Sequence, residues 1–299
     1  MKKATFLSSF ILKIAALLTM TFDHVGLLLE TMSPSNINTL QLAGVFRGIG
    51  RLALPLFVFM IVEGVIHTKN FKAYIFRLGV MAIAISIFFM VMEYSSLRGY
   101  AHGLLRAGNI FIDLTLVALS IYLLKQDKIW MKFLTLLPLA YSILSFVVCG
   151  IEYSNYIDIK WFPSFLTMQY DWYSVVLGLG FYASYKLADL YISTTQNLTG
   201  MDKSIWEVNG RYRLLVNIIA TFMLAVISFL YYLTKYIWPA GVFWDADVQL
   251  LAIISGALIL LYNGKRGYNA KWFQYGSYLY YPLHIIVIIA VFIIVNGGL

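Results

Sequence analysis

Long apolar stretches follow one another along the whole chain, and they constrain its fold more than any other feature. Nine such stretches, each of about 17–25 residues, lie at roughly 10–30, 42–66, 74–94, 108–124, 130–149, 163–185, 212–234, 246–262 and 275–296. A helix rises about 1.5 Å per residue, so about 20 residues cross the ~30 Å hydrocarbon core of a bilayer. Helices also satisfy their own backbone hydrogen bonds, which lipid cannot do. The sequence therefore predicts an all-α, polytopic transmembrane helix bundle of about nine spans.

The composition excludes an ordinary soluble protein. Of the 299 residues, 61% are hydrophobic and 12% are charged, whereas soluble domains contain about 25% charged residues. The connections between the apolar stretches are too short to form a soluble domain, so residues 1–299 are predicted to form one integral membrane domain. Cys149 is the single cysteine, which excludes an internal disulfide and a cysteine-based metal site. No metal is expected.

The distribution of basic residues predicts the orientation. If the N-terminus is cytoplasmic, fifteen Lys and Arg residues fall on the inner side of the membrane and four on the outer side. Cytoplasmic connections of membrane proteins carry such an excess. We therefore expect a multi-pass protein of the cell (cytoplasmic) membrane, with a cytoplasmic N-terminus and an extracytoplasmic C-terminus. The net charge of +8 therefore reflects the orientation of the protein in the lipid bilayer, which is its expected partner. We do not expect nucleic-acid binding.

Ionisable residues lie inside the first two apolar stretches. Asp23 and His24 are adjacent in the first, and Arg47 and Arg51 are four residues apart on one helix face in the second. Each such group costs about 2.5–3.5 kcal/mol to insert into lipid, so it needs a partner or a function. The topology places all four in the outer half of the membrane, where Asp23 can pair with the arginines. We expect a polar chamber that opens outward and ends near the bilayer centre.

Further polar residues complete this expectation. Pro55 follows the arginines and predicts a kink or break, because it clashes with the carbonyl of Arg51. His284 lies near the middle of the last stretch, two residues after Pro282, which perturbs the helix there. The remaining candidates are three residues at the outer layer and two near the inner end of the second stretch, namely Asn109, Asp113, Asp171, Glu63 and His67.

A histidine beside a carboxylate suits general base catalysis. Its pKa lies near the operating pH, and the carboxylate can orient the ring and stabilise its charged form. Nearby arginines can hold an anionic or carbonyl oxygen. These residues point to removal of a proton from a nucleophile that attacks a carbonyl. The residues alone leave open a proton-coupled transporter or flippase for an anionic or lipid-linked solute, and a non-catalytic scaffold whose buried charges only specify packing.

Five ordered motifs carry a resemblance to a known family. They are "DHVG" at 23–26, "FRGIGRLALPLFVFMIVEGVIHTKN" at 46–70, "YIFRL" at 74–78, "LYNGKRG" at 261–267 and "YLYYPLH" at 278–284. Together they resemble the TraX family of membrane acetyltransferases, known for acetylating the N-terminus of conjugative pilin. The family is similar to the wider group of membrane acyltransferases, in which a membrane histidine is considered central.

The resemblance implies an acetyltransferase that moves an acetyl group from cytoplasmic acetyl-CoA, as co-substrate, to an extracytoplasmic or membrane-associated acceptor. The acceptor would be a pilin-like protein, a surface glycan or a lipid. The expected catalytic residues are His24, Asp23 and His284. The expected substrate-binding residues are Arg47, Arg51, Asn109, Asp113, Asp171, Glu63 and His67. The basic turn after the eighth stretch would bind coenzyme A phosphates, with Lys69, Asn263, Lys265 and Arg266 as the expected residues.

Overall fold

A computed structural model of the chain describes residues 5–32, 35–94, 108–155, 159–200, 203–208, 210–237 and 246–295. Within these ranges the protein is all-α, and one isolated bridge joins Leu7 to Tyr262. The helices are α1 (Ser9–Met32), α2 (Ile37–Gly50), α3 (Ala53–His67), α4 (Phe71–Glu93), α6 (Ile110–Leu124), α7 (Ile129–Phe133), α8 (Leu136–Asn155), η1 (Ser164–Leu166), α9 (Asp171–Thr199), α10 (Lys203–Val208), α11 (Arg211–Ile237), α12 (Ala246–Gln249), η2 (Leu250–Ile254), α13 (Ser255–Leu260) and α14 (Lys271–Val295).

Within the described ranges, six helical stretches are long and apolar enough to cross a membrane. They are Ser9–Glu30, Ile37–His67, Phe71–Met92, Ile129–Glu152, Ser164–Thr199 and Arg211–Tyr236. The helices at Ile110–Leu124 and Ala246–Leu260 are apolar but shorter. The multi-pass membrane architecture is therefore supported, whereas the expected nine spans are not confirmed. The sixth predicted span also ends later than expected, because α9 continues as a helix to Thr199.

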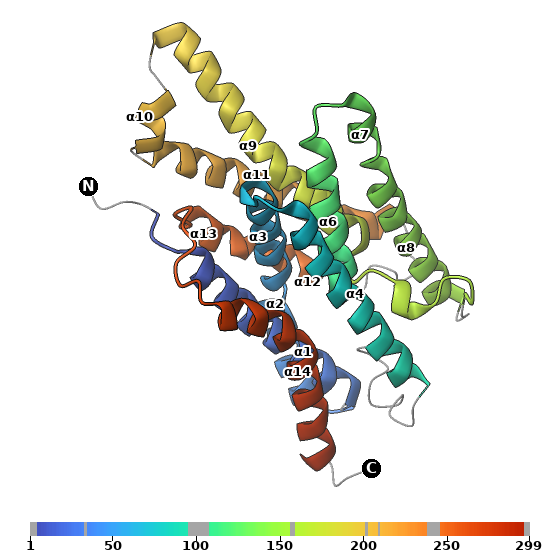
Figure 1. Cartoon of the computed structure of the whole chain (residues 1–299). Helices are drawn as coiled ribbons and strands as arrows, with labels where there is room; N and C mark the ends of the chain where they lie inside the picture. Colours follow the sequence, from blue (N-terminus) through green and yellow to red (C-terminus); the bar gives the residue numbers. More distant parts are fainter. Residues whose placement is uncertain are drawn as a thin grey trace.

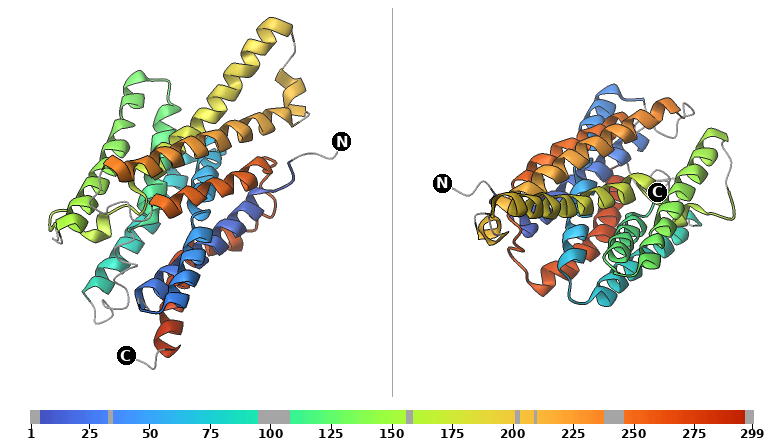
Figure 2. Two further views of the ribbon diagram at one scale, coloured as in Figure 1. Left: turned by 180° about the vertical axis from the view of Figure 1, so that it is seen from behind. Right: turned by 90° about the horizontal axis from the view of Figure 1, so that it is seen from above.

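The helix α3 lies inside the bundle, in contact with α1, α6 and α9 (Figure 1). The helices α2 and α14 both pack against α1 (Figure 2). The pair α9 and α11 packs together and extends beyond the other helices at one end, where α10 connects them (Figure 1). This arrangement brings the first and last helices of the chain side by side.

The second predicted span breaks where its proline predicts. Helix α2 ends at Gly50 and α3 begins at Ala53, which makes Pro55 the third residue of α3. Backbone N–H groups in the first turn of a helix have no partner within that helix, so a proline there forfeits no helical hydrogen bond. The break places Arg47 in the last turn of α2 and Arg51 at its C-terminal cap, where the helix dipole favours positive charge.

Glycines allow α1 and α2 to approach closely at this point. A Cβ atom on Gly50 would lie 2.2 Å from the Cβ atom of Asp23, and one on Gly26 would lie 3.0 Å from the backbone nitrogen of Arg47. Neither space admits a larger side chain without movement of the backbone. The glycines therefore set the distance at which the side chain of Asp23 meets those of the arginines.

Candidate functional site

Asp23, Arg47 and Arg51 form a buried ion cluster between α1 and α2. The Nη1 atom of Arg47 donates to Oδ1 of Asp23 at 3.0 Å, and Nη2 of Arg51 donates to the same oxygen at 3.2 Å. All three residues are buried: the exposed fraction is 4% for Asp23, 7% for Arg47 and 4% for Arg51. Gln249 of α12 accepts a longer contact from Arg51, at 3.4 Å. The sequence expectation that Asp23 pairs with both arginines is thus matched by the geometry.

His24 and His284 form a second pair beside this cluster. The Nε2 atom of His284 lies 2.9 Å from Nδ1 of His24. The Nδ1 atom of His284 lies 2.8 Å from the carbonyl oxygen of Tyr280, and Nδ1 of His24 lies 3.0 Å from that of Met20. A carbonyl oxygen only accepts hydrogen bonds, so both Nδ1 atoms carry protons and His284 accepts at Nε2. This tautomer leaves the lone pair of His24 on Nε2.

Two tyrosines enclose the histidine pair. The ring of Tyr280 stacks on that of His284 with centroids 5.1 Å apart, and its hydroxyl lies 2.6 Å from that of Thr21. The ring of Tyr281 meets both imidazoles edge-to-face. Helix α14 therefore supplies one histidine and two aromatic walls around the histidine of α1.

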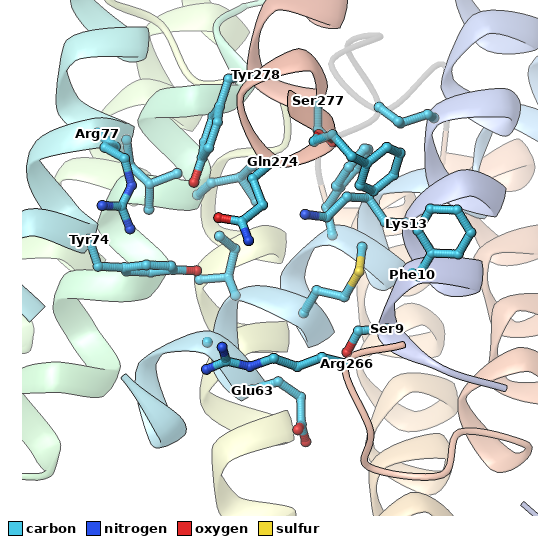
Figure 3. A pocket seen from close by; sticks show the side chains of 18 of the residues that line it. Ser9, Phe10, Lys13, Glu63, Tyr74, Arg77, Arg266, Gln274, Ser277 and Tyr278 are labelled. Atoms are coloured by element: carbon cyan, nitrogen blue, oxygen red, sulfur yellow. Dashed lines mark hydrogen bonds between the residues drawn. The ribbon is translucent and has the colours of Figure 1, made fainter. Parts of the chain in front are cut away.

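A cavity of about 670 Å³ lies between α1, α3, α4, α6 and α14 (Figure 3). At the end where α1 begins, it is lined by the start of α1, the end of α3 and the 264–269 turn, including Ser9, His67 and Arg266. At its deep end it is lined by apolar side chains, including Met20 and Phe111. The cavity thus runs from the end of the bundle where α1 begins to the level just before His24.

This cavity is distinct from the outward chamber that the sequence predicts. Its lining includes Ser9, His67 and Arg266, which lie at the end that the basic residues assign to the cytoplasm. The ion cluster and the histidines do not line it; they lie beyond its deep end, packed between helices. The two arginines and Asp23 contact one another closely, and the outward chamber stays a prediction.

Three cationic side chains line the cavity. They come from different parts of the chain: Lys13 from α1, Arg77 from α4 and Arg266 from the turn before α14 (Figure 3). Lys13 is half-buried and lies over the ring of Phe273, 5.7 Å from its centroid. Figure 3 shows Lys13 and Arg77 facing the space from opposite sides. The cavity is therefore suited to an anion.

Glu63 also lines the cavity, but its carboxylate is already paired. Its Oε1 atom accepts from Nη1 of Arg213 at 2.6 Å, and its Oε2 atom accepts from the hydroxyl of Tyr262 at 3.3 Å. The Nδ1 atom of His67 lies 3.7 Å from Oε2. The guanidinium of Arg213 also lies over the ring of Tyr262, 4.5 Å from its centroid. This arrangement ties α3 to α11, and it leaves the net charge of the cavity positive.

The expected coenzyme A residues divide into two groups. Arg266 lines the cavity, whereas Lys69, Asn263 and Lys265 do not. Lys69 and Lys265 are exposed. The Nδ2 atom of Asn263 donates to the carbonyl of Phe6 at 3.1 Å, which fixes the basic turn to the segment before α1. Asn263 is thus placed to hold the turn, and Arg266 is the residue of the four that faces the space.

Asn109, Asp113 and Asp171 lie away from the cavity lining. The Oδ1 atom of Asn109 caps α6, and its Nδ2 atom donates to the carbonyl of Ala82 at 2.8 Å. The carboxylate of Asp113 accepts from the backbone nitrogens of Gln169 and Tyr170 at 2.8 and 3.1 Å. Asp171 is the first residue of α9. Asp113 thus holds α6 to the start of α9, Asn109 holds it to α4, and the structure does not bring these residues to the ion cluster.

Four polar residues of this region were missed by sequence reasoning. Arg213 and Arg77 were counted with the basic residues that set topology, and Gln249 is an uncharged residue within an apolar stretch. Lys13 carried the clearest signal, because it lies within the first apolar stretch as Asp23 does. Among the residues that the structure describes, no group of three His, Cys, Asp or Glu residues could hold a metal ion.

Comparison with known proteins identifies the family. The family model described as "TraX protein" matches residues 8–292, a range that includes the ion cluster, both histidines and the cavity cations. The chain belongs to the TraX family. This TraX-family chain is 33% identical over 120 residues to a protein of Dichelobacter nodosus named "Probable fimbrial assembly protein FimC, serogroup H1". That similarity covers 38% of this chain and 45% of the relative, less than half the length of each. No solved structure matches the TraX-family chain.

Proposed function

We propose that this TraX-family protein is a membrane acetyltransferase. It would take an acetyl group from acetyl-CoA on the cytoplasmic side and transfer it to an acceptor at the membrane or outside it. One observation carries this proposal: a cavity lined by three cationic side chains ends just before a buried histidine pair. The TraX family and the fimbrial assembly relative favour the N-terminus of a pilin-like protein as the acceptor. A surface glycan and a lipid are the alternatives.

The dimensions of the cavity support coenzyme A as the donor. Coenzyme A carries its phosphates at one end and its thioester at the end of a long flexible arm. Lys13, Arg77 and Arg266 are suited to the phosphates, because charged donors bind such oxygens strongly. His24 follows Lys13 by 24 − 13 = 11 residues of the same helix, which is roughly 16 Å along its axis. The arm can therefore span the apolar part of the cavity and bring the thioester toward the histidines.

The histidine pair provides a base for the transfer. Nε2 of His24 would accept a proton from the acceptor amine or hydroxyl as its nitrogen or oxygen attacks the thioester carbonyl. The carbon–sulfur bond then breaks, and the leaving thiolate takes the proton back from the imidazolium. His284 fixes the tautomer of His24, and the charged ion cluster beside it holds α1 and α2 in place. A transient acetyl-histidine on His24 is the alternative route to the same product.

The test is replacement of the base. His24→Ala should abolish transfer, measured with purified protein in lipid nanodiscs, radiolabelled acetyl-CoA and acceptor-containing membranes. Ile83→Ala, which changes a side chain that is 64% exposed on α4, is the matched control and should retain transfer. If the His24→Ala protein elutes as a stable monodisperse species and still transfers label, the assignment of His24 as the base is wrong.

Neighbouring residues of the basic turn test the donor site. Arg266→Gln should raise the KM for acetyl-CoA about tenfold or more with little change in kcat, because a hydrogen bond to a charged group contributes about 1.5–3 kcal/mol. Lys265→Gln removes the adjacent charge outside the cavity and should leave the KM near that of the unmodified protein. Equal effects of the two variants would mean that the cavity is not the phosphate site.

A proton-coupled transporter or flippase is the second candidate function. The hydrogen bond between His24 and His284 is the observation that favours it, because paired imidazoles can relay protons. The cavity ends before the histidines, which disfavours a continuous path. Transport of an anionic solute into proteoliposomes without any coenzyme A would support this candidate and contradict the acetyltransferase.

A further inference from the structure

Tyr281 lies between the deep end of the cavity and both histidines. Its side chain lines the cavity, and the residue is 4% exposed. Its ring centroid lies 5.9 Å from that of His24 and 5.6 Å from that of His284. The ring of Tyr281 therefore bounds the space that a donor group from the cavity can occupy beside the histidines.

Phe111 of α6 packs against the same ring. The two centroids lie 5.4 Å apart with an angle of 87° between the planes, and Phe111 is 6% exposed. Leu17, Met20 and Leu114 complete the deep end, so the wall there is made of large apolar side chains. Protein interiors are close-packed, and a group larger than the available space has to displace such side chains.

Displacement of Tyr281 would also disturb the base. Its ring is fixed by edge-to-face contacts with two imidazoles on one side and with Phe111 on another. A long acyl chain attached to the donor would need room at the same point, and it would have to move a ring that holds both histidines. A short acyl chain would leave this ring in place.

We propose that Tyr281, supported by Phe111, sets the size of the acyl group, so that the site accepts acetyl and excludes longer aliphatic acyl groups. The inference rests on the proposed function, because it takes the donor to be an acyl-CoA. It adds a specificity-determining residue that the transfer chemistry itself does not require. One methylene too many in a fitted apolar pocket typically changes discrimination by about 10–200-fold.

The test is competition binding with the full-length protein in lipid nanodiscs. Radiolabelled acetyl-CoA is displaced by unlabelled acetyl-CoA or butyryl-CoA, and the ratio of the two affinities is measured for each variant. Tyr281→Ala should shift this ratio toward butyryl-CoA by at least about tenfold. Tyr281→Phe keeps the ring and should keep the ratio of the unmodified protein. Leu279→Ala, which changes a side chain that is 54% exposed on the same helix, should also keep it.

The outcomes separate this inference from the proposed function. If the unmodified protein does not bind acetyl-CoA, the proposed function fails and the inference fails with it. If it binds acetyl-CoA but the ratio is the same in Tyr281→Ala, only the inference is overturned. If Tyr281→Ala does not fold, Phe111→Leu opens the same wall from α6 and should shift the ratio in the same direction; an unchanged ratio there is equally decisive.

Discussion

Replacement of Asp23 by asparagine tests the ion cluster most directly. The amide has nearly the same shape as the carboxylate, so the change removes a charge and little volume. It leaves the guanidiniums of Arg47 and Arg51, which approach the same oxygen at 3.0 and 3.2 Å, without this anion. We expect the helix pair α1–α2 to separate more readily as a result.

The magnitude follows from the burial of these groups. The side chains of Asp23 and Arg51 are 5% and 4% exposed, so solvent screens the pair little. Removal of one partner from a buried ion pair lowers stability by about 3–5 kcal/mol, because the remaining charge stays buried. Glu30 provides a matched control, since its carboxylate lies 3.8 Å from Nε of Arg47 but its side chain is 42% exposed. Exposed pairs contribute about 0–1 kcal/mol.

The assay is equilibrium unfolding of the purified protein in mixed micelles, followed by intrinsic fluorescence. Asp23→Asn should lower the free energy of unfolding by about 3–5 kcal/mol and Glu30→Gln by less than about 1 kcal/mol. A double-mutant cycle with Arg51→Gln should give a coupling energy of about 0.5–3 kcal/mol. If Asp23→Asn unfolds within about 1 kcal/mol of the unmodified protein, the ion cluster does not hold the helices together and this reasoning is refuted.

Three further predictions follow from the same contacts. Gly50→Ala should lower stability by about 1–3 kcal/mol or more, because its Cβ atom would lie 2.2 Å from that of Asp23; the same unfolding assay measures it. Glu63→Gln should lower stability by about 3–5 kcal/mol, since it leaves Arg213, whose side chain is 13% exposed, without its carboxylate at 2.6 Å; an unchanged midpoint would contradict this. His284→Ala should lower kcat by at least about tenfold with little change in the KM for acetyl-CoA, because His284 orients His24; a change confined to KM would place His284 in donor binding instead.

Local sequence predicted the helical elements and the break in the second span. Apolar length fixes helices in lipid without any knowledge of their neighbours, and Pro55 fixes a break because the clash is within one turn. The number of spans was less predictable. Apolar stretches such as 110–124 form helices shorter than a bilayer crossing, and their depth depends on the helices around them.

For the candidate site, too, the sequence predicted some features and the packing of the helices decided others. Charge inside an apolar stretch was enough to single out Asp23, His24, Arg47 and Arg51, because such groups are costly unless they meet. The sequence could not show that a cavity with three cationic side chains lies beside these residues. That depends on how five helices pack around the cavity.

The amino-acid sequence by itself determined that this is a helical membrane protein of the TraX family and that its buried charges belong together. Those properties come from local composition and from the free energy of placing charge in lipid. Only the tertiary structure decided that Lys13 and Arg77 face a common cavity with Arg266, and that His24 bonds to His284 across the full length of the chain. Contacts between residues that distant depend on helix packing, which no local pattern encodes.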